Sequence, residues 1–108
     1  MNISIFDNDI YKVIRLEGSA DMTATNDLNA KVKQLISENN FNLIFDLSEL
    51  GFICSMGLGC LIFAHSRCLE NEGQFSIVNP QPAVVKLLQT TQLDHLFNIF
   101  PSIEAATS

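Results

Sequence analysis

The sequence predicts an α/β fold in which helices cover a mixed, largely parallel sheet of about five strands. Stretches patterned like strands alternate along the chain with stretches of helical periodicity. The first two strand-like stretches are joined by a short turn, which predicts a hairpin, whereas the later ones are separated by helices, which predicts parallel pairing. The length of 108 residues fits one domain, spanning residues 1–108, with a core of its own.

The elements are expected in the order β-β-α-β-α-β-α-β, with a terminal helical turn. Residues 3–18 predict the hairpin, with turn-forming residues at 7–9, and residues 18–21 predict a loop after it. A helix is expected over about residues 23–38, because its apolar residues recur at intervals of three and four. Thr23 or Thr25 is expected to cap this helix, and the pair at 39–40 to end it.

The second half of the chain alternates short apolar runs with helices. Residues 41–47 form a nearly continuous apolar run, typical of a strand covered on both faces, and residues 48–51 predict a turn. A helix is expected over about 56–71, stopped by Gly73, and a strand over 74–78. Pro82 suits the start of the next helix, residues 93–100 predict a turn and a last strand, and Ser102 is expected to cap the final helical turn.

Charge and composition exclude several classes of function. Twelve acidic residues against six basic ones give a net charge of −6, and the basic residues form no run, which argues against a nucleic-acid or anionic-membrane surface. No stretch reaches the roughly 18 apolar residues of a membrane-spanning helix, and the first residues do not resemble a signal peptide. Three cysteines in apolar surroundings predict reduced, buried thiols and a cytoplasmic location.

The junction at residues 51–59 places Ser55 between a thiol and a thioether at a predicted helix start, so motifs that bind phosphate or activate a nucleophile are tested there. No lysine follows the glycines, as a phosphate-binding P-loop requires, and a dinucleotide fingerprint would need glycine where Ile62 stands. A serine hydrolase elbow would need glycine at Ile53. If Cys54 were a phosphatase nucleophile, Arg67 would lie too far along the helix to close its phosphate loop.

Residues that could assist catalysis or bind a metal are also missing near Ser55. His65 is predicted on the core side of the helix and His95 is remote in sequence, so no general base is at hand. Cys60 and Cys68, eight residues apart with no second pair, match no zinc template. We therefore expect no catalytic residues, no metal and no cofactor.

The predicted helix over 56–71 carries two apolar stripes. The broad stripe should face the sheet and comprises Leu58, Leu61, Ile62, His65, Cys68 and Leu69. The narrow stripe lies opposite and comprises Met56, Cys60, Phe63 and Arg67. A helix that covers one sheet needs only one such stripe, so the second either packs under a neighbouring helix or forms a partly exposed docking surface.

Taken in order, three segments resemble the STAS domain as found in bacterial anti-anti-sigma factors. "LEGSAD" resembles the pattern that ends the family's hairpin, with Gly18 and Asp21 at the matching positions. "LIFDLSELGFICSMGLGCLI" resembles the strand, turn and signature that open the family's second helix. The segment from Gly73 to Ala106 resembles the family's closing strand, loop, helix and Leu-Asp-x-Leu-Phe pattern.

The resemblance implies a STAS-like fold and a regulator that is not an enzyme. It implies an anti-sigma factor antagonist that binds a cognate serine kinase acting as anti-sigma factor, is phosphorylated at Ser55, and is reset by a serine phosphatase. Partner contacts are expected at Asp21, Cys54, Ser55, Met56, Gly57, Cys60, Phe63 and Arg67. Phosphate at Ser55 would be stabilised by the helix N-terminus, and its negative charge would eject a partner.

Two departures from the family pattern keep other functions open. Cys54 replaces the usual aspartate of the signature, and Met56 replaces the small residue after the serine. One alternative is therefore a constitutive scaffold or adaptor subunit, in a signalling or lipid-transport complex, that no longer switches. The other is a small enzyme or nucleotide binder that uses the same helix N-terminus.

Overall fold

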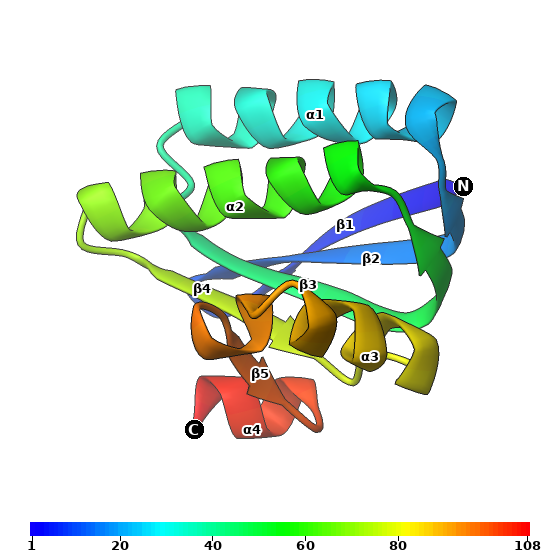
Figure 1. The fold of residues 1–108 in the computed structure, drawn as a ribbon. Helices are drawn as coiled ribbons and strands as arrows, with labels where there is room; N and C mark the ends of the chain where they lie inside the picture. Colours follow the sequence, from blue (N-terminus) through cyan, green and yellow to red (C-terminus); the bar gives the residue numbers. More distant parts are fainter.

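The computed structural model describes residues 1–108, folded as one five-stranded sheet with helices on both faces (Figure 1). The strands lie in the order β1-β2-β3-β4-β5, with β1 antiparallel to β2 and every other neighbouring pair parallel. The strands are β1 (Asn2–Asn8), β2 (Tyr11–Ala20), β3 (Asn42–Ile53), β4 (Gln74–Val78) and β5 (Asn98–Phe100). The predicted mixed, largely parallel sheet of five strands is confirmed.

The helices α1, α2 and α3 connect successive parallel strands, and α4 follows the last one (Figure 1). Their bounds are α1 (Met22–Ser37), α2 (Ser55–Glu70), α3 (Pro82–Thr90) and α4 (Ile103–Thr107), with a short 3-10 turn, η1 (Leu93–His95), after α3. Each of the three crossovers steps to the next strand in the same direction. Because such crossovers are right-handed, α1, α2 and α3 all lie on one face of the sheet, and only α4 covers the other.

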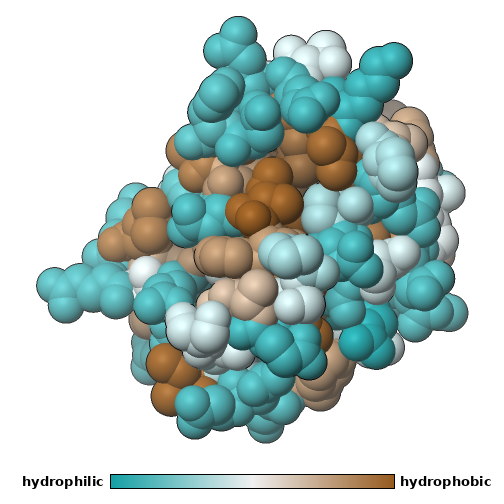
Figure 2. All heavy atoms as spheres, turned by 90° about the horizontal axis from the view of Figure 1, so that it is seen from below, coloured by the Kyte–Doolittle hydropathy of each residue, from teal (hydrophilic) through white to brown (hydrophobic).

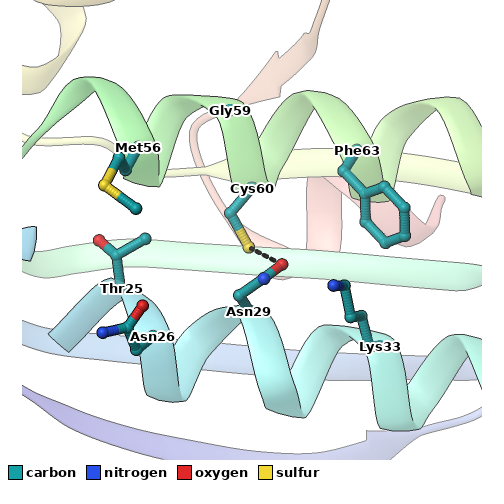
Figure 3. Close-up of a pocket in the computed structure, with 8 residues that line it drawn as sticks. All are labelled: Thr25, Asn26, Asn29, Lys33, Met56, Gly59, Cys60 and Phe63. Carbon is teal, nitrogen blue, oxygen red and sulfur yellow. Dashed lines mark hydrogen bonds between the residues drawn. The ribbon is translucent and has the colours of Figure 1, made fainter. Parts of the chain in front are cut away.

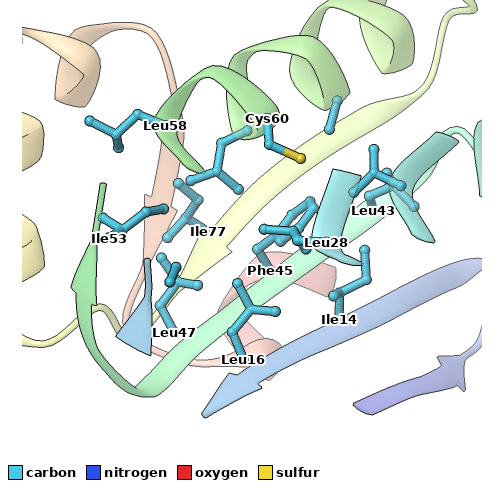
Figure 4. Close-up of a cluster of buried hydrophobic side chains, with 14 of the residues drawn as sticks. Ile14, Leu16, Leu28, Leu43, Phe45, Leu47, Ile53, Leu58, Cys60 and Ile77 are labelled. Carbon is cyan, nitrogen blue, oxygen red and sulfur yellow. The ribbon is translucent and has the colours of Figure 1, made fainter. Parts of the chain in front are cut away.

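The main core lies between the sheet and the three crossover helices (Figure 4). Alternate residues of the central strands point into it, among them Leu43, Phe45 and Leu47 of β3, and none of these three side chains is exposed. A smaller cluster on the opposite face joins Tyr11, Val13, Ile44 and Val78 to Ala106 of α4. Figure 2 shows the surface of the molecule from below, where apolar side chains gather between hydrophilic surroundings. The sheet is therefore covered on both faces at its centre, as the apolar run of residues 41–47 predicts.

The expected loop at 18–21 and the expected turn at 48–51 are wrong. β2 continues to Ala20, and β3 runs without interruption from Asn42 to Ile53. The β2–β3 register shifts twice, because β3 has an extra residue between Asp46 and Glu49 and another between Leu50 and Phe52. The residues that resemble a turn, Ser48 and Gly51, therefore lie at β-bulges, which insert a residue and bend the strand without ending it.

Two of the three predicted helix-end signals work differently from the prediction. Asp21, not Thr23 or Thr25, caps α1, because its carboxylate accepts a hydrogen bond from the N–H of Ala24 at 2.9 Å. α2 ends at Glu70, and the left-handed residue after it is Glu72, with φ of 59°. Gly73 is needed for space, since a Cβ there would collide with the carbonyl oxygen of Phe41. The Ser102 cap of α4 is confirmed, with the N–H of Ala105 donating to its hydroxyl at 3.1 Å.

Candidate functional site

The site forms where β2 and β3 end side by side and each leads directly into a helix (Figure 1). Ala20 pairs with Ile53 at the ends of these strands, and the N–H of Cys54 donates to the carbonyl of Ala20 at 2.9 Å. Asp21, which follows Ala20, caps α1. The N-termini of α1 and α2 are thereby held next to each other, and this brings Asp21 close to Cys54 and Ser55.

Ser55 is exposed and is the first residue of α2. The N-cap of α2 is Cys54 and not Ser55. The Cys54 side chain makes no capping hydrogen bond to the start of α2. Since the first N–H groups of a helix have no acceptor within it, those at the start of α2 remain available to an acceptor brought by a ligand or a modification.

The thiol of Cys54 lies in an environment that favours its anion. The hydroxyl oxygen of Thr25 lies 3.5 Å from the sulfur, and this contact does most to hold the pKa of Cys54 below the ordinary thiol value. The N–H groups of Gly57 and Met56 form no capping hydrogen bond to this side chain, but they also favour the thiolate. Together with Thr25 they outweigh the small effect of burial on the pKa of Cys54. By contrast, burial raises the pKa values of Cys60 and Cys68 to about 11. All three cysteines are free thiols.

Exposed apolar side chains stand on the segments next to Ser55. Nine large hydrophobic residues of the chain are exposed, and three of them stand on the segments that flank this serine. Met22 begins α1 and is 66% exposed, Phe52 lies near the end of β3 and is 51% exposed, and Met56 follows Ser55 and is 48% exposed. Because exposed apolar groups gathered at one place mark interaction surfaces, this apolar patch of Met22, Phe52 and Met56 points to a protein partner.

A groove of about 320 Å³, which shares Met56 with the apolar patch, lies between α1 and α2 (Figure 3). Met56 and Phe63 of α2 line one side, and Asn29 and Lys33 of α1 line the other. Cys60 lies at the bottom, with its sulfur 3.9 Å from the side-chain oxygen of Asn29. Its remaining lining residues are Thr25, Asn26 and Gly59. The narrow stripe of α2 therefore does both things predicted as alternatives: it packs beside α1 and leaves a partly exposed groove.

The eight predicted contact residues differ in how much surface they offer. Asp21, Ser55, Met56 and Arg67 are exposed, and Cys54 and Phe63 are half-buried. The guanidinium of Arg67 lies 5.2 Å from the centre of the Phe63 ring, which joins these two residues at the far end of the groove. Gly57 and Cys60 are buried.

Gly57 has a packing role. A Cβ at this position would lie 2.6 Å from Cγ1 of Ile53, so glycine lets α2 approach the end of β3. In the broad stripe, Leu58, Leu61, His65 and Cys68 are buried as predicted. The expectation for Ile62 and Leu69 is wrong, since they are 37% and 54% exposed. The stripe covers a narrower part of the helix than the sequence pattern predicts.

The α1 side of the site was not predicted from the sequence. Thr25, Asn29 and Lys33 recur at intervals of four residues and so share one face of α1, directed at α2. Their spacing was the available signal, but polar residues at this spacing also occur on the solvated face of a helix. Only the packing of α1 against α2 distinguishes the two cases.

Both histidines lie apart from Ser55. The ring of His65 packs edge-on against Phe75 and Phe97, about 15 Å along α2 from the serine. His95 lies in η1 with Nε2 3.9 Å from the Asp94 carboxylate. No group of three or more histidine, cysteine, aspartate or glutamate side chains is arranged to hold a metal ion. None of the helices has the length and apolar character needed to cross a membrane.

The STAS domain family model matches residues 3–106, nearly the whole chain. The chain is a STAS domain. Its fold closely matches a Thermotoga maritima protein assigned as an anti-sigma factor antagonist, with a TM-score of 0.92 and 19% identity over 97% of this chain and 91% of that one. An anti-sigma factor antagonist from Mycobacterium paratuberculosis gives a TM-score of 0.88 and 25% identity over 98% and 90% of the two chains.

A third structure of the same fold is the anti-sigma factor antagonist SpoIIAA in its unphosphorylated form. It matches this STAS domain with a TM-score of 0.78 and 21% identity over 98% of this chain and 94% of that one. The family and fold expected from the sequence are thus confirmed.

Proposed function

We propose that this STAS domain is a cytoplasmic anti-sigma factor antagonist that works by partner switching. Unmodified, it binds a serine kinase that also acts as an anti-sigma factor. The kinase transfers the terminal phosphoryl group of ATP to the hydroxyl oxygen of Ser55, the complex separates, and a serine phosphatase restores the free hydroxyl. The protein itself has no catalytic role in this cycle.

The placement of Ser55 carries the proposal. It is an exposed hydroxyl at the start of a helix of 16 residues, next to the segments that carry the apolar patch of Met22, Phe52 and Met56. We expect a partner that covers this patch to cover the hydroxyl as well. Structures of Bacillus SpoIIAA in both unphosphorylated and phosphorylated forms share this fold, which supports control by phosphate.

Phosphorylation at this position has two physical effects. The phosphate carries about two negative charges at neutral pH, which the free N–H groups and the positive end of the α2 dipole stabilise. The same charges stand among apolar side chains that a bound partner would desolvate, and burying uncompensated charge is costly. The modified domain is therefore stable while its complex is not.

The test uses candidate anti-sigma serine kinases, ATP and intact-mass measurement. We expect the wild-type domain to gain the mass of one phosphoryl group and Ser55→Ala to gain none. Ser66→Ala removes another exposed serine of the same helix, so it is the matched control and should be modified like wild type. Phosphate on Ser55→Ala, or on none of the variants with a kinase that binds the domain tightly, would contradict phosphorylation at Ser55.

A second candidate function is a constitutive adaptor, and the two departures around Ser55 favour it. Cys54 supplies no carboxylate beside the hydroxyl, and the half-exposed side chain of Met56 lies next to it. An adaptor would bind its partner through the same apolar patch without being modified. A stable complex that ATP does not dissociate, and that Ser55→Asp does not weaken, would favour the adaptor over the switch.

A further inference from the structure

The strand β1 leaves a long edge of the sheet open. It pairs with β2 over all seven residues without a bulge, and its other side has no neighbouring strand. Every second residue of such an edge directs its N–H and C=O groups away from the sheet. Edge strands are usually protected by lysine, proline or a bulge, and the segment Asn2–Phe6 contains none of these and no charged residue. The opposite edge, β5, has only three residues and is followed by Pro101.

The exposed edge is apolar on both faces of the sheet. Ile5 is 39% exposed and pairs with Ile14, which belongs to the core on the helix side. Phe6 is 37% exposed and pairs with Val13, which belongs to the cluster on the α4 side. Ile10, in the turn of the hairpin, is 64% exposed. The hairpin thus carries three of the nine exposed large hydrophobic residues, and a strand added at this edge would meet apolar side chains on either face.

Charges next to the edge are largely neutralised within the chain. Lys12 forms an ion pair with Asp7 of β1. Arg15 donates to Asp46 at 2.9 Å, and its guanidinium lies 5.2 Å from the centre of the Phe6 ring. Glu17, opposite Asn2, is exposed and lies one strand in from the edge. Although the chain carries a net charge of −6, two copies of this edge can approach without strong local repulsion.

We propose that two copies of this chain associate through β1, antiparallel about a twofold axis at Ser4. The two five-stranded sheets then join into one continuous sheet. This register opposes the uncharged segment Asn2–Phe6 to itself, places Ile3 of one copy opposite Ile5 of the other, and leaves both Asp7 side chains outside the paired region. A twofold axis makes one surface complementary to itself, so no second docking surface is needed.

The proposed dimer leaves the surface around Ser55, here called the Ser55 surface, free in both copies. Asn2 pairs with Glu17, close to the end of β2 from which α1 starts, so the Ser55 surface lies at the Asn2 end of β1. Because the two β1 strands run in opposite directions, the two Ser55 surfaces lie at opposite ends of the joined sheet. The dimer therefore does not depend on the proposed switch, and each inference can fail without the other.

Sedimentation velocity over a concentration series tests the association. We expect wild type to pass from monomer to dimer as its concentration rises, and Ile5→Lys to remain monomeric, because the two added positive charges lie on the same face of the sheet, diagonally across the twofold axis. Ile62→Lys is the matched control, since Ile62 on α2 is 37% exposed against 39% for Ile5, and it should dimerise like wild type. Circular dichroism checks that both variants are folded.

A disulfide tests the register. In a Cys54→Ser background, oxidation of Ser4→Cys should link two chains through residue 4, because directly opposed residues of an antiparallel pair lie within disulfide range. Ser66→Cys, an exposed serine replaced on α2, should not cross-link in this way. A wild-type protein that stays monomeric at all concentrations, a dimer that survives Ile5→Lys, or a Ser4→Cys variant that does not cross-link would each overturn the proposal.

Discussion

The hydroxyl oxygen of Thr25 lies 3.5 Å from the sulfur of Cys54 and also donates to the carbonyl of Asp21 at 2.8 Å. One side chain of α1 thus contacts both the N-cap residue of its own helix and the N-cap residue of α2. The hydroxyl has a single proton, so when Cys54 ionises this proton can turn from the Asp21 carbonyl to the thiolate. The lowered pKa of Cys54 depends on this contact more than on any other.

Replacing Thr25 by valine should therefore raise the pKa of Cys54 toward the ordinary thiol value. The measurement is the pH dependence of the alkylation rate, which follows the thiolate. Cys60 and Cys68, with pKa values of about 11, contribute only a slow background. Thr25→Ser keeps the hydroxyl and should preserve the wild-type profile. A profile unchanged by Thr25→Val would show that the N–H groups of α2 dominate instead.

Cys54→Asp should stabilise the domain, because an aspartate N-cap accepts a hydrogen bond from the open start of α2 and interacts favourably with the helix dipole. The expected gain over Cys54→Ala is about 0.5–2 kcal/mol in the free energy of unfolding, measured by urea denaturation. Equal stability of Cys54→Asp and Cys54→Ala would mean that the first turn of α2 has no need of a side-chain cap.

The two glycines of the signature should respond oppositely to alanine. Gly59→Ala meets no atom within 4 Å and should gain about 1 kcal/mol, the preference of a helix for alanine over glycine. Gly57→Ala would place its Cβ 2.6 Å from Cγ1 of Ile53 and should lose stability despite the same preference. Thermal unfolding of both variants gives the comparison. Stabilisation by Gly57→Ala would show that the end of β3 can move away from α2.

Asp46 should make stability depend on pH in the acid range. Burial alone would raise its pKa, but the N–H of Ser48 and the guanidinium of Arg15 outweigh burial and hold the pKa below its ordinary value of 3.8. The lowered pKa in the folded state stabilises the protein above about pH 3.8, and this contribution is lost as the pH falls through the folded-state pKa.

Asp46→Asn should remove that acid-range dependence. Without the charged partner for Arg15, it should also cost about 1–3 kcal/mol of stability near neutral pH. Urea denaturation at a series of pH values measures both effects. A variant that shows the wild-type slope below pH 3.8 would assign the dependence to other carboxylates.

His65 should act in a separate pH window. Burial against Phe75 and Phe97 lowers its pKa below the ordinary value of 6.5. The unfolded chain then binds a proton more readily than the folded one, so stability is fully present above pH 6.5 and decreases as the pH falls below it. His65→Leu should flatten this part of the stability profile and leave the Asp46 part intact. Conversely, Asp46→Asn should flatten the Asp46 part of the stability profile and leave the His65 part intact.

Sequence patterns predicted the elements of this fold better than their ends. The order of strands and helices depends on apolar periodicity, which many residues share, so a single misleading residue cannot overturn it. The bulges in β3 were missed because Ser48 and Gly51 are turn formers, and only pairing with β2 shows that the chain continues as a strand. Asp21 was missed as the cap of α1 because two threonines nearby were equally good candidates.

Only part of the candidate site was predicted, because local sequence does not show which residues of different elements come together. The exposed Ser55 and Met56 lie on α2, whose signature residues carried the resemblance. Asn29 and Lys33 come from α1 and line the groove opposite Cys60 and Phe63 only after the helices pack. Exposure of Ile62 depends on how wide a part of α2 the sheet covers, which is a property of packing and not of local sequence.

The uncapped start of α2 gives this domain a built-in spectroscopic reporter. Amide protons without an acceptor exchange rapidly with solvent, so the backbone amides of Ser55 and Met56 should exchange quickly while Cys54 supplies no hydrogen bond. An anion at Ser55 that accepts their hydrogen bonds would slow that exchange and shift their resonances. The amide resonances of Ser55 and Met56 would then report in solution whether an anion is present at Ser55, even when the partner protein is unknown.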